Sequence, residues 1–230
     1  MHKVSKYGWD WNVRRTTGYG RCDTMDERII DEVYNAGWFQ IDGLLHYPVE
    51  SIIDIGAHIG AFSVKAARAY PKAHVLAFEP IKETFELLRE NTKDLNVVEF
   101  NNPVSGCGMI IDGTNVLFPD MNTGATSMQY RPLLELENKN DYSTIFIKDL
   151  ISSYGDIDLI KIDCEGGERY IIPELDLSRI GIAIIEFHTG ILYGVQMLNL
   201  NEFQEFVGLF TRNGFRIHAC FELELPNKSF

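Results

Sequence analysis

Short apolar runs rich in β-branched residues alternate with segments of helical periodicity from residue 51 onward. Such runs are typical of buried strands, and apolar residues three to four positions apart are typical of helices. The expected strands are residues 51–55, 74–78, 97–100, 159–163, 182–187 and 216–221, and the expected helices are 60–70, 81–91, 148–154, 168–175 and 201–213. Strands separated by helices form parallel sheets with right-handed crossovers. The sequence therefore predicts an α/β, Rossmann-like fold, a mostly parallel twisted sheet with helices on both faces.

One stretch departs from this alternation. Residues 109–118 are expected to form a hairpin, because Asp112 and Gly113 together tolerate the positive φ of a tight turn. A polar segment, residues 120–127, follows it.

The first 49 residues are predicted to form an N-terminal arm and a helix, set apart from a main domain at 50–230. Residues 1–22 lack periodicity, and a helix is expected to start at Asp23 or Thr24. The arm is rich in aromatic side chains: Tyr7, Trp9, Trp11 and Tyr19. These side chains would form a lid or part of a substrate pocket. Alternatively, they pack the arm against the main domain or a second subunit, and this alternative is favoured.

Composition excludes some classes of partner. The 230 residues carry a formal net charge of −12, which is unfavourable for gripping nucleic acid. No apolar run approaches the roughly 18 residues needed to span a membrane, and no signal peptide is evident. The four cysteines are scattered without metal-ligand spacing, as expected for free thiols in a reducing cytoplasm. The prediction from composition is a cytoplasmic protein that binds neither nucleic acid nor a membrane.

Residues 54–60 join the first strand to the first helix and contain two glycines. Glycines there allow a tight turn and close approach of a ligand. A dinucleotide prefers G-x-G-x-x-G, but His58 and Ala61 occupy the second and third glycine positions, so a nicotinamide or flavin cofactor is disfavoured. S-adenosylmethionine lacks phosphate, and Asp54 with the loop amides can receive its amino and carboxylate groups.

Glu79 ends the second strand, about one β-α-β step after Asp54. An acidic side chain here can accept two hydrogen bonds from a ribose diol. Alternatively, Glu79 is an exposed strand-end residue and Asp54 a helix cap, but the pair together favours a cofactor site. The expected contacts with S-adenosylmethionine are Asp54, Gly56, Ala57, His58, Gly60, Phe62, Glu79 and Pro80.

Carboxylates crowd the end of the fourth expected strand. Period-two alternation places Lys161 and Asp163 on one face, where they can pair. Asp163, Glu165 and Glu168 then gather at the carboxyl edge, where crowding raises the chance that one of them acts as a base. Glu165 and Glu168 would otherwise cap the next helix, and this alternative is favoured for Glu168.

Glu186 and His188 share a face at the end of the fifth expected strand. His188 is the first candidate for a general base and Asp163 the second, although a lone histidine is often structural. Asp163, Glu186 and His188 could instead hold a divalent metal, which is not favoured because only periodicity brings them together.

The sequence resembles the FkbM family of methyltransferases across roughly residues 50–190. The matching stretches are IIDIGAHIGAFS (52–63), VLAFEP (75–80), NTGATSM (122–128), DLIKIDCEGGER (158–169) and IIEFH (184–188). The resemblance implies a class I methyltransferase fold and O-methylation of a hydroxyl on a small molecule, natural product or sugar. It implies cofactor contacts at Asp54, Gly56, Gly60 and Glu79, and active-site roles for Asp163, Glu165, Glu186 and His188.

Some features depart from the family pattern. Residues 101–105 replace an alanine-containing stretch, the chain stops soon after residue 221, and residues 1–49 match no known pattern. A binding protein without turnover and an NAD-dependent oxidoreductase are the alternatives. A nucleic-acid methyltransferase is disfavoured by the acidic charge and by the lack of an Asn-Pro-Pro-Tyr-type segment. The sequence identifies neither the acceptor nor the oligomeric state.

Overall fold

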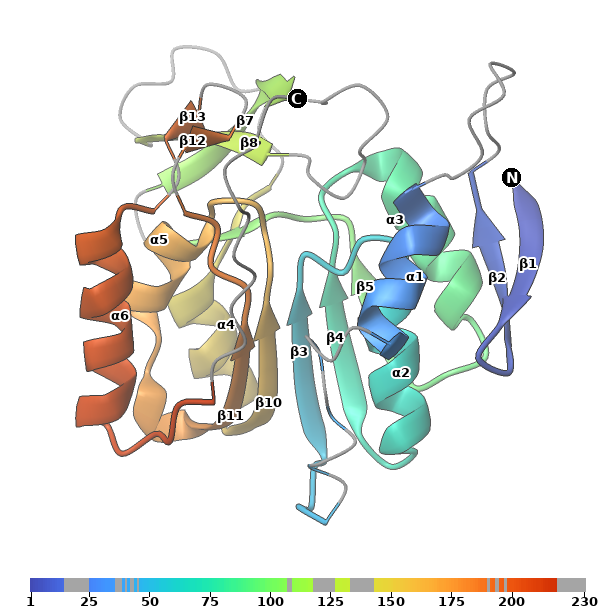
Figure 1. The fold of residues 1–230 in the computed structure, drawn as a ribbon, viewed down its shortest axis with the longest axis horizontal. Coiled ribbons are helices and arrows are strands. Elements are labelled where there is room, and N and C mark those ends of the chain that lie inside the picture. The colour runs from blue at the N-terminus through green and yellow to red at the C-terminus, as the bar shows by residue number, and fades with distance from the viewer. Residues whose placement is uncertain are drawn as a thin grey trace, which may run out of the picture.

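The centre of the protein is a five-stranded parallel sheet (Figure 1). The computed structural model describes residues 1–14, 25–35, 39, 41, 44, 46–106, 109–117, 127–132, 143–189, 191–192, 195–196 and 198–218. In sheet order the strands are β11 (Ile180–Ile185), β10 (Ile157–Ile162), β3 (Ser51–Ile55), β4 (His74–Phe78) and β5 (Val97–Phe100). All four pairings are parallel, so the predicted architecture is confirmed.

The strand order reverses between β3 and β10. The chain builds β3, β4 and β5 in one direction and then returns to add β10 and β11 on the other side. At the end of β10, the Asp163 N–H donates to the carbonyl of Ile55, the last residue of β3, over 3.1 Å. In open parallel sheets, ligands bind beyond the carboxyl ends of the strands at such a reversal. The functional site is therefore expected beside the ends of β3 and β10.

Helices cover both faces of the sheet (Figure 1). One face carries α1 (Met25–Asn35), α2 (Ala61–Ala69) and α3 (Lys82–Thr92), and the other carries α4 (Ile147–Tyr154), α5 (Glu168–Ile171) and α6 (Leu200–Arg212). Successive strand residues point to opposite faces. Ile52 accordingly packs in one core with α1 and α2, whereas Ile53 packs in a second core with α4, α5 and α6.

The N-terminal residues form a hairpin that the sequence analysis did not predict. Strands β1 (His2–Lys6) and β2 (Trp9–Val13) pair antiparallel. Tyr7 and Gly8 between them both have positive φ, 54° and 70°, as in a type I′ turn. Trp11 and Val13 are fully buried in the same core as Ile52. The alternation of Trp9, Trp11 and Val13 was the available signal.

The predicted turn at Asp112 and Gly113 is wrong. Both residues lie within one strand, β7 (Met109–Leu117), which pairs antiparallel with β8 (Ser127–Pro132). The pairing register shifts between Ile111 and Val116. A shift of this kind marks a β-bulge or irregularity, in which residues of one strand lie between paired positions without a partner of their own. The expected polar segment lies mostly outside the described residues.

Two expected elements near the end of the chain are shorter or absent. The helix predicted at 168–175 stops at Ile171 and continues as a 3-10 turn, η4 (Ile172–Glu174), because Pro173 has no N–H to donate into an α-helix. The strand predicted at 216–221 is not formed at residues 216–218. These residues are exposed, so their alternating apolar and polar side chains do not pack against the core. Residues 219–221 lie outside the described residues. The helix predicted at 201–213 is confirmed, with Asn199 and Glu202 forming a capping box.

Short pairings complete the fold. A parallel pair joins β6 (Val104–Ser105) to β9 (Ile145–Phe146), and an antiparallel pair joins β12 (Ile191–Leu192) to β13 (Val195–Gln196). No helix in the described part of the chain is long and apolar enough to cross a membrane. Cys164 is a free thiol, and the other three cysteines lie outside the described residues.

Candidate active site

The loop between β3 and α2 needs glycine at two positions. Gly56 and Gly60 have φ angles of 76° and 90°, which side chains rarely adopt. A Cβ on Gly56 would lie 1.7 Å from the Asp163 carbonyl oxygen, and one on Gly60 would lie 2.9 Å from Leu88 Cδ1. The N–H groups of Gly56 and Ala57 both donate to the Phe78 carbonyl. The loop is therefore packed directly against the ends of β4 and β10.

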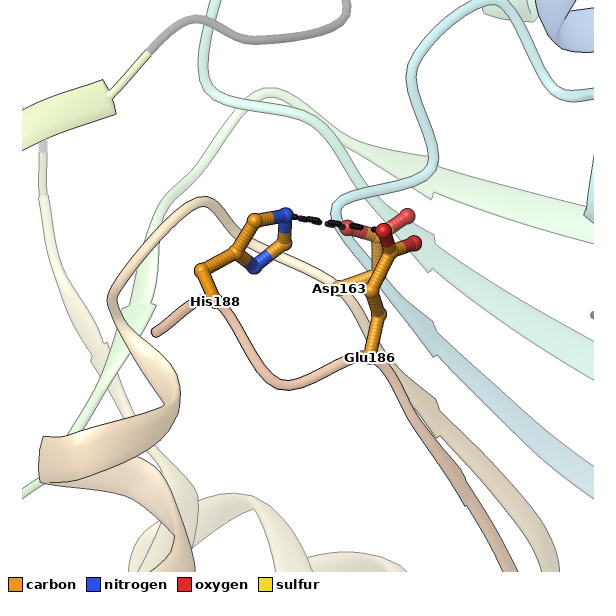
Figure 2. A group of neighbouring side chains, drawn as sticks. All are labelled: Asp163, Glu186 and His188. Atoms are coloured by element: carbon orange, nitrogen blue, oxygen red, sulfur yellow. Dashed lines mark ion pairs between the residues drawn. The ribbon is translucent and has the colours of Figure 1, made fainter. Parts of the chain in front are cut away.

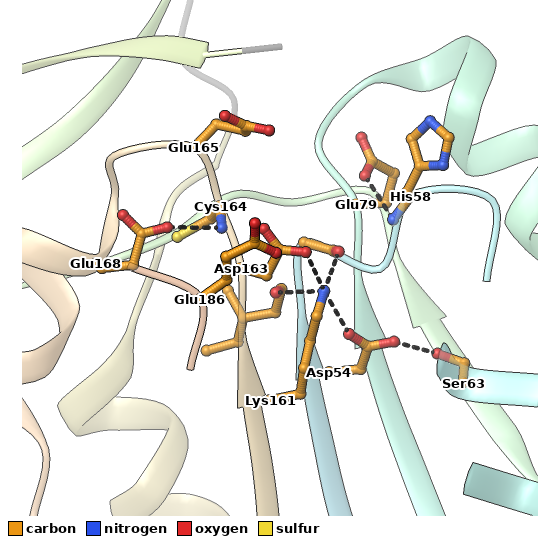
Figure 3. Close-up of polar contacts among 12 residues, drawn as sticks. Asp54, His58, Ser63, Glu79, Lys161, Asp163, Cys164, Glu165, Glu168 and Glu186 are labelled. Atoms are coloured by element: carbon orange, nitrogen blue, oxygen red, sulfur yellow. Dashed lines mark hydrogen bonds and ion pairs between the residues drawn. The ribbon is translucent and has the colours of Figure 1, made fainter. Parts of the chain in front are cut away.

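Lys161 lies between two carboxylates at the strand reversal (Figure 3). Its Nζ is 3.3 Å from Asp54 Oδ1 and 3.2 Å from Asp163 Oδ2, and it donates to the Gly56 carbonyl over 2.6 Å. Burial lowers the pKa of Lys161, but the charges of Asp163 and Asp54 outweigh burial and raise the pKa overall. The predicted Lys161–Asp163 pair is confirmed, and Asp54 is a second partner.

Asp54 is enclosed by protein. Its side chain is 0% exposed, and its Oδ2 accepts a hydrogen bond from Ser63 Oγ over 2.6 Å while Oδ1 faces Lys161. Three other residues expected to contact the cofactor, Ala57, Phe62 and Pro80, make contacts within the protein. Ala57 is a buried residue of the loop itself, the Phe62 ring packs edge-on against Phe39, and the Pro80 carbonyl accepts from the Asn101 amide.

Glu79 lies at the end of β4 beside the glycine loop (Figure 3). Its Oε2 accepts the His58 N–H over 3.0 Å and its Oε1 accepts the Ile81 N–H over 2.8 Å. Each carboxylate oxygen has a second acceptor position, so two hydrogen bonds from a diol can still be received. Burial raises the pKa of Glu79 to about 7, although both N–H groups and the charge of Lys161 oppose this shift.

Asn101 and Arg14 also support this region and were missed in the sequence. Asn101 Nδ2 donates to the carbonyls of Glu79 and Pro80, and the only signal was that residues 101–105 depart from the family pattern. Arg14 Nη2 lies 3.0 Å from His58 Nε2. No local pattern connects residue 14 with residue 58.

Glu168 organises the loop that follows β10. Its side chain is fully buried; Oε1 accepts the Cys164 N–H and Oε2 accepts the Gly166 N–H, over 3.0 and 2.9 Å. The interpretation of Glu168 as a cap of the following helix is wrong: Glu168 lies in the first turn of α5, but its carboxylate accepts from loop N–H groups that precede the helix, and the N-cap residue is Gly167. Oε1 also lies 3.1 Å from His188 Nδ1, a contact that sequence reasoning did not anticipate.

The other nitrogen of His188 faces the remaining carboxylates (Figure 2). Nε2 is 3.3 Å from Glu165 Oε2, 3.8 Å from Glu186 Oε1 and 3.9 Å from Asp163 Oδ1. The four residues predicted for the active site are thus brought together. We call Asp163, Glu165, Glu186 and His188 the acidic cluster.

Protonation in the acidic cluster departs from ordinary values. Burial lowers the pKa of His188, but the hydrogen bond to Glu168 and the charges around it outweigh burial and raise the pKa to about 10. Burial raises the pKa of Glu165 to about 8. Burial and the charge of Asp163 raise the pKa of Glu186 to about 7. His188 is therefore held as an imidazolium at neutral pH, and burial favours the protonated forms of Glu165 and Glu186.

Three atoms of the cluster are also spaced as metal ligands. One ligand atom each from Asp163, Glu186 and His188 lies within 4.8 Å of the others. A histidine that donates its second ring nitrogen to a carboxylate, as His188 does to Glu168, is common at metal sites. The residues could therefore hold a divalent cation of the kind bound by mixed oxygen and nitrogen ligands.

The sheet order, with a glycine-containing loop after β3 and an acid at the end of β4, is that of the Rossmann-like α/β class. Residues 54–217 match the methyltransferase FkbM domain, and the chain belongs to that family.

Curated relatives carry methyltransferase names. Methyltransferase 1 of Beauveria bassiana is 26% identical over 169 residues, covering 65% of each chain. Methyltransferase sdnD of Sordaria araneosa is 27% identical over 184 residues, covering 64% of this chain and 68% of the relative. The chain thus spans about two thirds of the length of these relatives.

Solved structures with a similar arrangement are distant. The plantazolicin methyltransferase BpumL, in complex with SAH, is 16% identical with a TM-score of 0.44, covering 82% of this chain and 71% of that one. Magnesium protoporphyrin IX methyltransferase of Synechocystis PCC 6803, with bound SAH, is 14% identical with a TM-score of 0.44, covering 88% and 81%. At these values the likeness says nothing about ligand or substrate.

Proposed function

We propose that the protein transfers a methyl group from S-adenosylmethionine to a hydroxyl of a small molecule, natural product or sugar. One observation carries the proposal: the loop between β3 and α2, which has His58 and Ala61 where a dinucleotide site prefers glycine, lies between the strand reversal and the buried carboxylate of Glu79. Membership of the FkbM family supports the reaction class. The cytoplasmic location expected from the cysteines stays a prediction.

The cofactor contacts divide into two kinds in this proposal. Glu79 receives the ribose diol, because its oxygens keep acceptor positions beside the loop. Asp54 instead positions the loop through Lys161 and Ser63, because its own oxygens are enclosed. The amides of Gly56, Ala57, His58 and Gly60 already donate within the protein, so they are not assigned to the cofactor carboxylate.

The acidic cluster would receive the proton of the acceptor hydroxyl. The sequence pattern made His188 the first candidate for the general base. An imidazolium, however, has no free nitrogen with which to take a proton. We assign the base to Glu186, whose pKa of about 7 suits proton transfer at neutral pH. Its side chain is 34% exposed, so an acceptor can reach it. Alignment of the hydroxyl oxygen with the C–S bond supplies the larger part of the rate.

The test is isothermal calorimetry of the purified protein with S-adenosylhomocysteine, with NAD as the control. Micromolar binding of the homocysteine compound alone supports the proposal and justifies a screen of hydroxylated acceptors, read out as release of S-adenosylhomocysteine. Binding of NAD instead, or of neither compound, contradicts it. If the protein binds S-adenosylhomocysteine but no acceptor in the screen leads to its release from S-adenosylmethionine, a binding protein without turnover is favoured.

Replacing Glu79 by alanine is expected to weaken S-adenosylhomocysteine binding by about 10–100-fold, because hydrogen bonds to a charged group contribute about 1.5–3 kcal/mol each. Glu79→Gln keeps the shape and one acceptor oxygen, so its loss should be smaller. Glu83→Ala removes an exposed carboxylate from the following helix and serves as the control. Calorimetry measures all three, and unchanged affinity in Glu79→Ala would exclude Glu79 as the ribose contact.

The same carboxyl group gives cofactor binding a pH dependence. The diol donates to the ionised form, whereas Glu79, with a pKa of about 7, is increasingly protonated as the pH falls through 7. Affinity for S-adenosylhomocysteine should therefore weaken below pH 7, approaching tenfold per pH unit. In Glu79→Gln the affinity for S-adenosylhomocysteine should not change with pH in this range. If the affinity of this variant still falls as in the wild type, a group other than Glu79 takes up the proton.

Turnover is expected to continue after removal of divalent metals. The His188 imidazolium already lies between the carboxylates and balances part of their charge. The check is release of S-adenosylhomocysteine after dialysis against a chelator, with and without added Mg²⁺ or Mn²⁺. Loss of turnover that a metal restores would instead identify Asp163, Glu186 and His188 as metal ligands.

A further inference from the structure

Arg14 joins two N-terminal elements that lie outside the family match. It directly follows β2, and it forms a forked ion pair with Asp26 in the first turn of α1, with Nη2 2.6 Å from Oδ1. The Arg14 N–H also donates to Asp26 Oδ2 over 2.8 Å. Asp26 is fully buried, so this pair fixes the end of β2 to the start of α1.

The same guanidinium also reaches α3 and the loop between β3 and α2, which we call the cofactor loop. Nη2 donates to His58 Nε2 over 3.0 Å, and Nη1 donates to Thr84 Oγ1 over 3.1 Å. Burial and the charge of Arg14 lower the pKa of His58 to about 3, so its ring is neutral and Nε2 can accept. The His58 backbone has φ of 50°, a conformation that non-glycine residues rarely adopt without support.

The His58 N–H in turn donates to Glu79 Oε2 over 3.0 Å. A continuous set of contacts therefore runs from Arg14 through the ring and the amide of His58 to the carboxylate proposed to hold the ribose. A second link lies close by, since Asn91 accepts the Asn12 N–H and donates to the Ile59 carbonyl over 2.9 Å. The end of β2 thus holds the loop at two successive residues, His58 and Ile59.

We propose that Arg14 is a positioning residue for cofactor binding, which acts by holding His58 so that its N–H keeps the Glu79 carboxylate in a fixed geometry toward the cofactor. The inference rests on the proposed function and extends it to a residue before the family domain. Arg14 would touch neither the methyl group nor the acceptor.

The test compares two arginines that both fix the N-terminal hairpin. Arg68 Nη1 donates to the Tyr7 carbonyl over 2.9 Å and its guanidinium lies over the Trp9 ring, at the turn end of the hairpin. Arg14→Ala is expected to weaken S-adenosylhomocysteine binding at least tenfold, whereas Arg68→Ala should change it less than twofold. Circular dichroism and thermal unfolding check that both variants are folded. Equal losses in the two variants, or none in Arg14→Ala, would overturn the proposal.

A double-variant cycle separates positioning from general stability. If Arg14 acts through His58, then Arg14→Ala added to His58→Ala should cost little further affinity. A merely structural arginine would weaken binding equally in both backgrounds, which would overturn the proposal. Failure of the wild-type protein to bind S-adenosylhomocysteine would overturn the proposed function itself. Wild-type binding with an unaffected Arg14→Ala would overturn only the role of Arg14.

Discussion

Replacing Glu186 by glutamine is expected to lower turnover by about 10²–10⁴-fold, the usual contribution of a positioned base. The change keeps the shape of the side chain and its approach to His188 Nε2, 3.8 Å away, but removes the carboxylate that takes the proton. S-adenosylhomocysteine affinity should stay within about twofold, because the base contacts the acceptor and not the cofactor. The readout is release of S-adenosylhomocysteine with an acceptor from the hydroxyl screen, beside calorimetry on the same sample.

Two variants of the same cluster serve as comparisons. Glu165→Gln should have a smaller effect, because Glu165, with a pKa of about 8, is largely protonated at neutral pH already. Wild-type turnover should rise with pH through about 7 as Glu186 ionises, and Glu186→Gln should lack that rise. If His188→Gln loses more turnover than Glu186→Gln, the base is His188, as its place in the sequence first indicated.

Replacing Lys161 by methionine is expected to destabilise the fold by about 3–5 kcal/mol, the usual effect of removing one partner from a buried ion pair. Lys161 is 4% exposed, and Asp54 would keep its charge without the ammonium 3.3 Å away. The Gly56 carbonyl would lose its donor as well. Chemical denaturation, followed by circular dichroism, measures the free energy of unfolding.

Two further variants serve as controls for this experiment: Lys65→Met, and Lys161→Met combined with Asp54→Asn. Lys65 is similarly buried, but its Nζ donates to the backbone carbonyls of Val33 and Phe39, so Lys65→Met should cost less. Adding Asp54→Asn to Lys161→Met removes the stranded charge and should recover part of the lost stability. Equal losses for both lysines, with no recovery, would show that Lys161 acts through packing and not through Asp54.

The sheet could be predicted because its signals are local. Each strand of the parallel sheet is a short apolar run, and period-two alternation was enough to pair Lys161 with Asp163. Because neighbouring parallel strands end at the same edge of the sheet, the sequence also predicted that Glu79 lies near the loop that follows the first strand. The first hairpin was missed because its turn, Tyr7-Gly8, lacks the usual Asn-Gly or Asp-Gly signature.

The contacts that tune the site depend on the assembled fold. Glu168 and His188 are 20 positions apart, and the hydrogen bond between them changes His188 from a candidate base into an imidazolium. Arg14 and His58 are 44 positions apart and come from different layers. Periodicity reports which face a side chain occupies, but it contains no information about which distant side chain faces it.

Gly56 limits how this enzyme can evolve. A single added carbon would overlap the main chain of Asp163, and main chain cannot turn aside as a flexible side chain can. A saturation library at position 56 should therefore return glycine alone, whatever acceptor is used for selection. Changes in specificity must then accumulate elsewhere, because any side chain at position 56 would displace the main chain at Asp163, which carries the acidic residues of the site.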